Sequence, residues 1–435
     1  MTITLEKPNL TGSVKSILSK SHVHRLLIAA ALYGEKTQII CDTHLSADIN
    51  ATIKCLNALG AEIEQSENIL KIKSNTQSLR QIKSADFYCA ESGSTFRFML
   101  PIVCALGINS RFFPEGRLPN RPLSPLREEL INHGCHVDSV GTLPFTTSGK
   151  LKSGIYEIEG NVSSQYITGL LFALPLLEES SEIHIIGKLE SKPYVDMTLE
   201  VLADFGVDIL VKDDSTILIG GKNKNENKKD NLTFYADGDW SNAAFWLTAG
   251  AIGKNKMTVT GLRTDSAQGD KEILTLLKAF GAGIDTKIDK KSNLADITIY
   301  PAPLKGIKID AADIPDLVPI LSLAAACAEG TTKIYNAQRL RLKESDRIAT
   351  VCDLLSTLGA DIQETQDGLI INGNSAKAED SPLKGGTVSS HNDHRIAMTA
   401  AIAACVCSES VTITGAEAVN KSYPLFWQDY DNLNN

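Results

Sequence analysis

Several signatures that would assign a protein to a class at once are missing from this chain. Its nine cysteines show no CxxC spacing, and the N-terminal sequence MTITLEKPNL lacks a signal-peptide pattern. The longest apolar stretch, Leu317 to Ala328, is too short to cross a bilayer. There is no Walker A sequence, and a formal net charge of −9 disfavours nonspecific nucleic-acid binding. We therefore expect a cytoplasmic protein with reduced thiols, no membrane segment and no nucleic-acid partner.

What the chain does have is an internal repeat. Six times, a Ser, Asp or His opens an apolar, Ala-rich helix, a Gly or an acidic stretch ends that helix, and a β-branched strand follows. The openers lie 70 to 78 residues apart, at Ser21, Ser94, Ser164, Ser241, Asp316 and His394. A fixed period of this kind indicates a repeat architecture and has to be interpreted before any local motif.

A second helix in each repeat strengthens this interpretation. It ends at a Gly followed by an apolar strand, in copies such as NALGAEI and STLGADI. These glycines recur every 72 to 78 residues, at Gly60, Gly134, Gly206, Gly281 and Gly359. Gly suits the left-handed residue that ends a helix. Each repeat is therefore predicted to run strand, helix, strand, helix, strand, strand.

Six repeats in 435 residues fit two halves of three repeats each. The hydrophilic run from Lys222 to Asn231 lies just past the middle of the chain. We interpret it as a solvated surface loop rather than as the linker between the halves. The crossings between the halves are instead predicted near Lys20, before the first helix, and near Asp239, where the fourth helix begins.

Cations stand beside many of the predicted helix starts. They are Lys20, Arg121, Lys192, Lys343, Arg395 and Lys421. A cation near a helix N-terminus opposes the helix dipole by roughly 0.3–1 kcal/mol, so several such placements indicate a compensating anion. Exposed backbone N–H groups at helix starts also bind phosphate and carboxylate directly. If the repeats bring these helix ends together, the sequence predicts a site for highly anionic ligands, without specifying a reaction.

Two carboxylates among those cations narrow the chemistry. Asp316 lies at a predicted helix start, and Glu344 stands beside Lys343 and Arg347. Neighbouring cations would keep Asp316 ionised, as a general base requires, and Glu344 could transfer a proton. Asp316 could instead be an ordinary helix cap, and Glu344 an acid that complements the dipole in a first helical turn. The charge pattern alone leaves both interpretations open.

Five short motifs, taken in order, match one family. They are SKSxxxR from Ser19, VSSQ from Val162, SKPY from Ser191, KESDR from Lys343 and NDHR from Asn392. In register from about residue 10 to residue 425, the set resembles the 5-enolpyruvylshikimate-3-phosphate synthases. The resemblance implies an α/β fold of two domains, each with three βαβαββ units in an inside-out barrel, whose helix N-termini face an interdomain cleft. It also implies a discontinuous domain, residues 1–18 plus 239–435, and a second domain over residues 19–238.

The family transfers the enolpyruvyl group of phosphoenolpyruvate to the 5-hydroxyl of shikimate 3-phosphate, through a tetrahedral intermediate, and releases phosphate. By matching position, Asp316 is the expected base for that hydroxyl. Glu344 is the expected proton donor at C3, with Lys20 sharing that duty. The resemblance implies no metal and no organic cofactor. We expect a monomer that binds only small-molecule substrates.

The same carry-over predicts two overlapping sets of binding residues. Those expected to bind phosphoenolpyruvate are Lys20, Gly93, Arg121, Gln165, Arg347, Arg395 and Lys421. Those expected to bind shikimate 3-phosphate are Lys20, Ser21, Arg25, Ser163, Ser164, Gln165, Ser191, Tyr194, Asp316 and Lys343. Arg347 and Arg395 would clamp the carboxylate of phosphoenolpyruvate, for which the planar guanidinium is suited.

The chain departs from the family pattern in a few places. Glu91 stands where Asn is usual, Ser94 where Thr is usual, and Phe98 where many relatives have Pro, which puts the shape of the loop beside phosphoenolpyruvate in doubt. Arg339 stands where some relatives place an Asn that contacts shikimate. None of these departures removes a residue that the chemistry requires.

Other functions fit the sequence less well. The enolpyruvyl transferases that act on UDP-N-acetylglucosamine share the fold, but they carry a Cys in the loop matching Pro114 to Pro122 and an Asn where this chain has Ser21. A noncatalytic repeat protein that binds acidic metabolites is a second alternative, which the presence of both Asp316 and Glu344 opposes. His391 and His394 have HxxH spacing, but no third ligand follows, so we expect no metal site.

Overall fold

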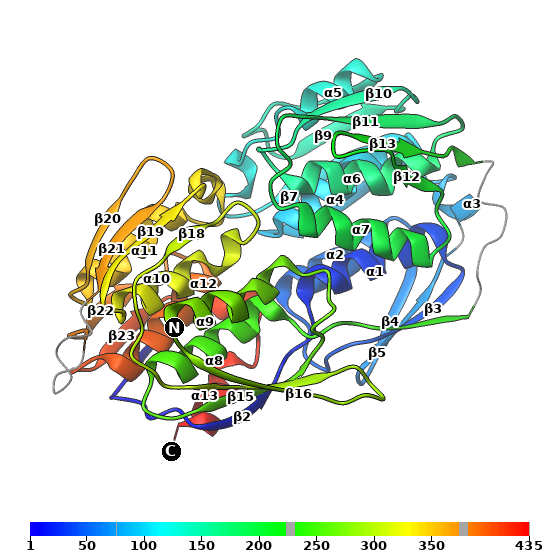
Figure 1. Ribbon diagram of the computed structural model, residues 1–435. Helices are drawn as coiled ribbons and strands as arrows, with labels where there is room; N and C mark the ends of the chain where they lie inside the picture. Colours follow the sequence, from blue (N-terminus) through cyan, green and yellow to red (C-terminus); the bar gives the residue numbers. More distant parts are fainter. Residues whose placement is uncertain (75, 223–230, 374–381, 435) are drawn as a thin grey trace. The chain divides into compact units, whose positions relative to one another are not determined.

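The computed structural model describes residues 1–74, 76–222, 231–373 and 382–434. Most of the hydrophilic run from Lys222 to Asn231 lies outside the described residues, so its interpretation as a loop stays a prediction. The chain divides into two compact units, one formed by Met1–Ser19 with Asp237–Asn435 and the other by Lys20–Ala236. Both units alternate helices with small sheets, which confirms the predicted α/β class (Figure 1).

The unit Lys20–Ala236 contains three repeats. The first consists of α1 (Lys20–Tyr33), β3 (Lys36–Ile40), α2 (Ala47–Ala58), β4 (Glu62–Ser66) and β5 (Ile69–Lys73). The second consists of β6 (Ser84–Ala90), α4 (Gly93–Leu106), β7 (Asn109–Pro114), α5 (Leu126–Asn132), β8 (Cys135–Val137) and β9 (Phe145–Gly149), and it follows the short helix α3 (Thr76–Leu79). The third consists of β10 (Ile155–Glu159), α6 (Ser164–Ala173), β11 (Ser181–Ile186), α7 (Lys192–Asp204), β12 (Ile209–Val211) and β13 (Thr216–Ile219), and β14 (Leu232–Tyr235) closes the unit.

The other unit, which we call the terminal unit because it holds both chain ends, contains the remaining repeats. Its first consists of β2 (Gly12–Lys15), α8 (Trp240–Ile252), β15 (Met257–Leu262), α9 (Ile273–Phe280), β16 (Gly283–Ile288) and β17 (Ala295–Tyr300). Its second consists of β18 (Lys308–Asp310), α10 (Val318–Ala326), β19 (Gly330–Tyr335), α11 (Arg347–Thr357), β20 (Asp361–Glu364) and β21 (Leu369–Gly373). Its third consists of β22 (Gly386–Ser389), α12 (His394–Ala403), β23 (Val411–Thr414) and α13 (Phe426–Leu433), joined by β1 (Thr2–Leu5).

One strand order recurs in both units. The first strand of a repeat pairs in parallel with the second, and the last two strands form an antiparallel hairpin beside the second. In the second repeat the order is β6-β7-β9-β8, with Phe112 opposite both Phe87 and Phe145. Because side chains alternate between the faces of a strand, these phenylalanines share one face. Phe112 and Phe145 pack edge-on against Phe96 of α4, which anchors that helix on its sheet.

Two strands are exchanged between the repeats of the two units. β2 precedes α1 in the sequence but pairs with β15 in the terminal unit. β14 precedes α8 in the sequence but pairs with β3 in the unit Lys20–Ala236. The chain therefore passes from one unit to the other twice, at Ser19–Lys20 and at Ala236–Asp237.

The sixth repeat does not follow the predicted strand order. β22 and β23 are parallel, as in the other repeats, but no hairpin follows them in the described residues. The position beside β23 is taken by β1, which runs antiparallel with Thr2 opposite Thr414. A local sequence pattern could not indicate this pairing, because its partners lie at opposite ends of the chain.

Three of the six apolar helices, α8, α10 and α12, form the interior of the terminal unit. α8, α10 and α12 contact one another, and almost all of their residues are buried, including the runs of Ala. Small side chains allow this close approach. The second set of helices ends as predicted, because each of the five glycines has a φ between 75° and 111°. No helix in the described ranges is long and apolar enough to cross a membrane.

Candidate active site

The residues that cap four of the helices precede the predicted openers by one or two positions. Backbone N–H groups in the first turns of α4, α6, α8 and α12 donate to the side chains of Ser92, Ser163, Asp239 and Asp393. The predicted Ser164 and His394 are the first residues of α6 and α12, whereas Ser94 and Ser241 are the second residues of α4 and α8, and none of the four is the cap. Several residues that can cap stand close together at each start, and the sequence does not choose between them. The correction leaves Ser94 and Ser241 to bond other side chains.

Two of the predicted cations do not stand at the start of an α-helix, and a third is paired with a carboxylate of its own helix. Arg121 follows a short 3-10 helix, and α5 begins only at Leu126. Lys421 is the last residue of the 3-10 helix η8 (Ala416–Lys421), and α13 begins at Phe426. Lys192 does begin α7, but its Nζ lies 2.6 Å from Asp196 Oδ1 one turn later, an exposed pair of ordinary kind. The dipole argument therefore carries less weight than the sequence indicated.

Arg347 is the centre of a buried ion-pair cluster in the terminal unit. Its Nε donates to Asp393 Oδ2 at 2.8 Å, its Nη1 to Asp316 Oδ1 at 2.7 Å, and its Nη2 to Glu344 Oε2 at 2.9 Å. The Arg347 side chain is 2% exposed. Removing one partner from such a cluster leaves a buried charge uncompensated. One guanidinium thus fixes both of the carboxylates predicted to transfer protons.

Asp316 is bound by a second arginine at its other oxygen. Nη2 of Arg395 donates to Asp316 Oδ2 at 2.8 Å. Burial alone would raise the pKa of Asp316, but Arg395, Lys343 and Arg347 outweigh burial and hold that pKa far below its ordinary value. Asp316 is therefore ionised at neutral pH, as predicted from the neighbouring cations.

The structure excludes the plainer interpretations of the two carboxylates. Asp316 lies inside the 3-10 helix η5 (Pro315–Leu317), and the residue at the cap position of α10 is Leu317. Glu344 precedes α11, which starts at Arg347 with Asp346 as its side-chain cap. Asp316 is thus not the cap of α10, and Glu344 is not an acid in the first turn of α11; the arginine cluster holds both.

The charges of this cluster affect the pKa of Lys343. Lys343 follows the 3-10 helix η6 (Gln338–Leu342). Burial lowers the pKa of Lys343 to about 8, an effect that Asp316 opposes and that Arg347 and Arg339 reinforce. Nη2 of Arg339 also donates to the carbonyl oxygen of Ala312 at 2.6 Å. Arg339, which replaces the Asn of some relatives, therefore adds positive charge beside Lys343.

Lys421 is attached to the segment that leads into α12. Its Nζ donates to the carbonyl oxygen of Asn392 at 2.6 Å. His391 and Asn392 have φ values of 49° and 55°, a left-handed conformation that costs non-glycine residues about 1 kcal/mol or more each. This turn brings Lys421 to the start of the helix that carries Arg395. The same turn directs His391 to Asp353, 2.9 Å away.

In the unit Lys20–Ala236, Lys20 also has a carboxylate partner. Its Nζ lies 2.7 Å from Oδ2 of Asp48, which stands in the first turn of α2. A buried polar chain runs behind this pair, from His24 Nδ1 to Thr52 Oγ1 at 2.8 Å and from there to Thr95 Oγ1 at 2.7 Å. Burial lowers the pKa of His24 well below its ordinary value, so the chain is uncharged. It ties α1, α2 and α4 together near their N-terminal ends.

Gly93 begins α4 beside two guanidinium groups. A Cβ atom at Gly93 would lie 2.9 Å from Nη1 of Arg121 and 3.3 Å from Nη1 of Arg97. The missing side chain therefore lets both arginines reach the N-terminus of α4. Backbone N–H groups and the helix dipole already favour an anion there, and both arginines are at least nine-tenths buried. This is the strongest anion-binding geometry in the described part of the unit.

Arg97 also fixes the predicted ligand residue Gln165. Its Nη1 donates to Gln165 Oε1 at 2.8 Å, and its Nη2 donates to the carbonyl oxygen of Pro122 at 3.0 Å. Because an arginine can only donate, the amide of Gln165 must direct its NH₂ group elsewhere. That group donates to Ser94 Oγ at 3.1 Å. Gln165 is thus held as a hydrogen-bond donor.

The residues expected to hold shikimate 3-phosphate lie at the starts of α1, α6 and α7. Arg25 is 3% exposed and donates to the carbonyl oxygens of Ser21 and Tyr194 at 2.8 and 2.9 Å, and to Thr198 Oγ1 at 2.8 Å. It therefore ties α1 to α7. Ser163 caps α6, Ser164 is its first residue, and Ser191 precedes α7 with a φ of 55°.

Sequence reasoning missed three residues of these clusters, namely Asp48, Arg97 and Asp393. Asp393 lies inside the NDHR motif, and the other two lie in the first turns of predicted helices. A signal was present for Arg97 and Asp393, which stand within a few residues of the predicted ligands Gly93 and Arg395. The signal was incomplete, since the partners of Asp48 and Asp393 lie 28 and 46 residues away along the chain.

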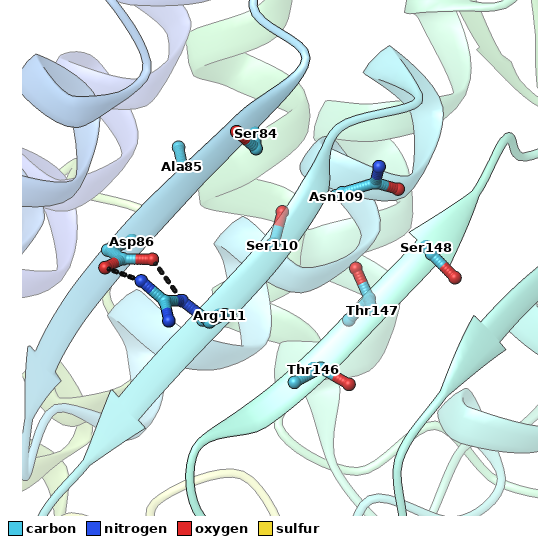
Figure 2. A pocket seen from close by; sticks show the side chains of 9 residues that line it. All are labelled: Ser84, Ala85, Asp86, Asn109, Ser110, Arg111, Thr146, Thr147 and Ser148. Atoms are coloured by element: carbon cyan, nitrogen blue, oxygen red, sulfur yellow. Dashed lines mark hydrogen bonds and ion pairs between the residues drawn. The ribbon is translucent and has the colours of Figure 1, made fainter.

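A shallow groove of about 610 Å³ lies elsewhere, on the strands β6, β7 and β9 (Figure 2). It is lined by hydroxyl groups and by the ion pair between Asp86 and Arg111, whose Oδ2 and Nη2 atoms are 2.6 Å apart. None of the predicted site residues lines this groove. We assign the chemistry to the charged clusters, because they hold the buried ionisable groups.

Comparison with known proteins finds similarity along nearly the whole chain. Residues 5–430 match the sequence profile of the family described as EPSP synthase (3-phosphoshikimate 1-carboxyvinyltransferase). The 3-phosphoshikimate 1-carboxyvinyltransferase of Clostridium kluyveri is 42% identical over 99% of this chain and 97% of its own length. That of Clostridium acetobutylicum is 44% identical over 98% and 95%.

Solved structures show the same likeness. The EPSP synthase of Acinetobacter baumannii has a TM-score of 0.80 at 26% identity and covers 100% of this chain and 98% of its own. The enolpyruvyl transferase NikO of Streptomyces tendae, at 19% identity, shares the fold with a TM-score of 0.75 over 99% and 96% of the two chains. The chain therefore belongs to the EPSP synthase family.

Proposed function

We propose that the chain transfers the enolpyruvyl group of phosphoenolpyruvate to the 5-hydroxyl of shikimate 3-phosphate, with Asp316 and Glu344 as its proton-transfer groups. The observation that carries the assignment of roles is the arginine cluster, in which Arg347 holds both carboxylates and Arg395 holds Asp316. The family and the similar proteins support the substrates. UDP-N-acetylglucosamine, the alternative acceptor, is not favoured by these comparisons.

The reaction needs one proton to reach phosphoenolpyruvate and one to leave the acceptor. Glu344 gives a proton to C3, which makes C2 electrophilic, and Asp316 takes the proton of the 5-hydroxyl as its oxygen bonds to C2. The tetrahedral intermediate then loses the C3 proton, and its bond to the phosphate oxygen breaks. The products are the enolpyruvyl ether and inorganic phosphate. Asp316 is ionised as this role requires, because three cations depress its pKa.

The cations orient the substrates and stabilise charge as phosphate departs. We assign the carboxylate of phosphoenolpyruvate to Arg347 and Arg395, and its phosphate to Lys20, Arg121 and Lys421. The N-terminus of α4 supports this assignment, since the space at Gly93 admits two guanidinium groups. Gln165 would contact both substrates, with the one amide N–H that its bond to Ser94 leaves available as a donor.

Shikimate 3-phosphate is assigned to the starts of α1, α6 and α7, together with Lys343 and Asp316. The residues are Ser21, Arg25, Ser163, Ser164, Ser191 and Tyr194. The bonds of Arg25 to the backbone at Ser21 and Tyr194 support this assignment, because they hold α1 and α7 in one arrangement. Lys20 lies at the same helix start as Ser21 and would share proton transfer at C3.

Phosphate release from phosphoenolpyruvate tests the proposal. The native enzyme is expected to release phosphate with shikimate 3-phosphate and not with UDP-N-acetylglucosamine. Asp316→Ala and Glu344→Ala should fold and lose nearly all turnover, and Glu344→Ala should still bind shikimate 3-phosphate by calorimetry. Glu364→Gln serves as a matched control, because Glu364 is an exposed carboxylate of the same unit paired with Arg341. Rates near the native value in either alanine variant would remove that residue from the mechanism.

We also propose that the enzyme works as a monomer in the cytoplasm. One chain supplies every residue of the proposed site, so the reaction requires no second copy. All nine cysteines are free thiols, as expected for a reducing compartment. Sedimentation at micromolar concentration tests the monomer, and fractionation of the producing cells tests the compartment.

A further inference from the structure

A buried carboxyl group that the reaction does not use lies behind the arginine cluster. Asp270 belongs to the 3-10 helix η4 (Gly269–Glu272) and is 2% exposed. Its Oδ2 accepts a hydrogen bond from the hydroxyl of Ser241, in the first turn of α8. Its Oδ1 is buried and has no hydrogen-bond partner in the described part of the chain. Burying a carboxylate with one oxygen unpaired costs free energy of folding. We therefore expect Asp270 to have a role in the site.

The loop that carries Asp270 is itself fastened to the start of α8. Gln268 accepts a hydrogen bond from the backbone N–H of Trp240 at 3.0 Å and donates to the carbonyl oxygen of Gly238 at 2.8 Å. Asp239 caps the same helix through the N–H of Asn242. Asp270 therefore completes a set of contacts that fixes the first turn of α8.

That first turn supports the arginine cluster. The carbonyl oxygen of Ser241 accepts a long hydrogen bond, 3.5 Å, from Nη1 of Arg395. Nη2 of the same guanidinium holds Asp316 at 2.8 Å. A chain of contacts thus runs from Asp270 through Ser241 and Arg395 to Asp316. All four residues belong to the terminal unit.

We propose that Asp270 is a positioning residue, which sets the place of Arg395 beside Asp316 through the first turn of α8. The inference rests on the roles proposed above for Arg395 and Asp316. It adds a residue that contacts neither substrate in that assignment. Asp270 acts by holding Ser241, and it carries its own proton below neutral pH while Asp316 stays ionised.

The electrostatics agree with this division of labour. The charged groups that face Asp270 are Asp316, Arg395 and Asp239. Burial, followed by Asp316 and Asp239, raises the pKa of Asp270 to about 7, and Arg395 opposes the rise. The pKa of Asp316 moves the opposite way. When the pKa values of two neighbouring carboxyl groups shift in opposite directions, one group keeps its proton and the other stays ionised and can act as a base.

Three variants separate anchoring from charge. Asp270→Ala removes the acceptor of Ser241 and should raise KM for phosphoenolpyruvate about tenfold, while KM for shikimate 3-phosphate stays within about twofold. Asp270→Asn keeps an acceptor and should restore KM for phosphoenolpyruvate, but its plot of kcat/KM against pH should lack an ionisation near 7 that the native enzyme shows. Ser241→Ala should act as Asp270→Ala does, and the two changes together should not be additive.

The outcomes distinguish this inference from the proposed function. The inference fails if Asp270→Ala leaves both KM values unchanged or raises both equally, or if Asp270→Asn and native enzyme share one pH profile. If Asp316→Ala remains active, the proposed function fails, whatever Asp270 does. Asp86→Asn serves as a control for loss of a carboxylate, because Asp86 pairs with Arg111 on an exposed strand. Should Asp270→Ala not fold, Asp270→Asn with Ser241→Ala still decides the question.

Discussion

Replacing Asp270 with Asn is expected to stabilise the protein at neutral and alkaline pH and to have no such effect near pH 4. Burial and the charge of Asp316 raise the pKa of Asp270 from 3.8 to about 7. Because the folded state binds this proton more tightly than the unfolded chain does, the stability contributed by Asp270 falls as the pH rises from about 4 to about 7. Above pH 7 the cost reaches about 4 kcal/mol, at about 1.4 kcal/mol per pH unit.

Asn cannot ionise, so Asp270→Asn should recover part of that cost. Structural relaxation lowers the effective cost of a buried charge, and we expect a gain of about 2–4 kcal/mol above pH 7. Thermal unfolding of native and variant proteins between pH 4.5 and 8.5 measures the difference, with about 2–4 °C per kcal/mol for a unit of this size. Comparing variants cancels the titration of all other groups.

Asp86→Asn gives the matched control with the opposite sign. The hydrogen bond from Arg111 lowers the pKa of Asp86, so its stabilising contribution is present above about pH 4 and is lost as the pH falls. This variant should therefore be slightly less stable than the native protein at neutral pH. A difference between Asp270→Asn and native protein that is constant from pH 4.5 to pH 8.5 would refute the reasoning.

Three further predictions follow from single contacts. Gly93→Ala places a Cβ 2.9 Å from Arg121 and should raise KM for phosphoenolpyruvate while calorimetry shows unchanged binding of shikimate 3-phosphate; equal effects on both ligands would contradict the placement of the arginine. Arg347→Lys cannot hold three carboxylates, leaves Asp393 with an unpaired buried charge and should lower the free energy of unfolding by about 3–5 kcal/mol, which urea titration measures; a loss under about 1 kcal/mol would contradict it. Lys343→Met should abolish turnover, because Lys343 is assigned to shikimate 3-phosphate. Burial lowers the pKa of Lys343 to about 8, so the variant should be more stable than the native protein below pH 8. Urea unfolding should show this gain shrinking as the pH rises from 8 towards 10.5.

The fold was predictable where its signals are local and repeated. Each of the predicted glycines, such as Gly60 and Gly359, adopts the left-handed conformation that ends its helix, because one residue type and its neighbours suffice for that signal. The apolar helices were equally clear, since their runs of small and branched side chains are buried on all sides. The period of the repeat then made these local signals reinforce one another.

The sequence could not show contacts between distant segments. The exchange of β2 and β14 between units and the pairing of β1 with β23 join strands from far-apart parts of the chain. No turn or spacing in the sequence encodes such partners. The prediction of the capping residues was wrong for a different reason. Nearby residues such as Ser92 and Ser94 have almost equal capacity to cap a helix.

The site shows the same division between local and distant information. Cations near helix starts were visible in the sequence and led to the expectation of an external compensating anion. The structure supplies internal anions instead, with Asp48 beside Lys20 at 2.7 Å and Asp316 beside Arg395 at 2.8 Å. The sequence argument therefore identified the charged residues but overestimated their need for a ligand.

These internal pairs lead to a prediction about how the proposed base is activated. Asp316 binds Arg347 and Arg395 at 2.7 and 2.8 Å, and these are the arginines assigned to the carboxylate of phosphoenolpyruvate. A carboxylate bound there must share their hydrogen bonds with Asp316 and adds a negative charge beside it. Both effects raise the pKa of Asp316, so it should become a stronger base only when the donor substrate is present.

Carbon-13 NMR of protein labelled at the aspartate side-chain carboxyl can follow this change, with the Asp316 signal assigned by its loss in Asp316→Asn. Phosphoenolpyruvate alone supports no transfer, so the complex is stable during titration. We expect the midpoint of the Asp316 titration to move to higher pH on saturation with phosphoenolpyruvate, and to move less in Arg395→Lys, whose single ammonium cannot bind both carboxylates in a fork. An unchanged or lower midpoint in the native complex would mean that both arginines keep their hydrogen bonds to Asp316, and that the carboxylate of phosphoenolpyruvate binds elsewhere.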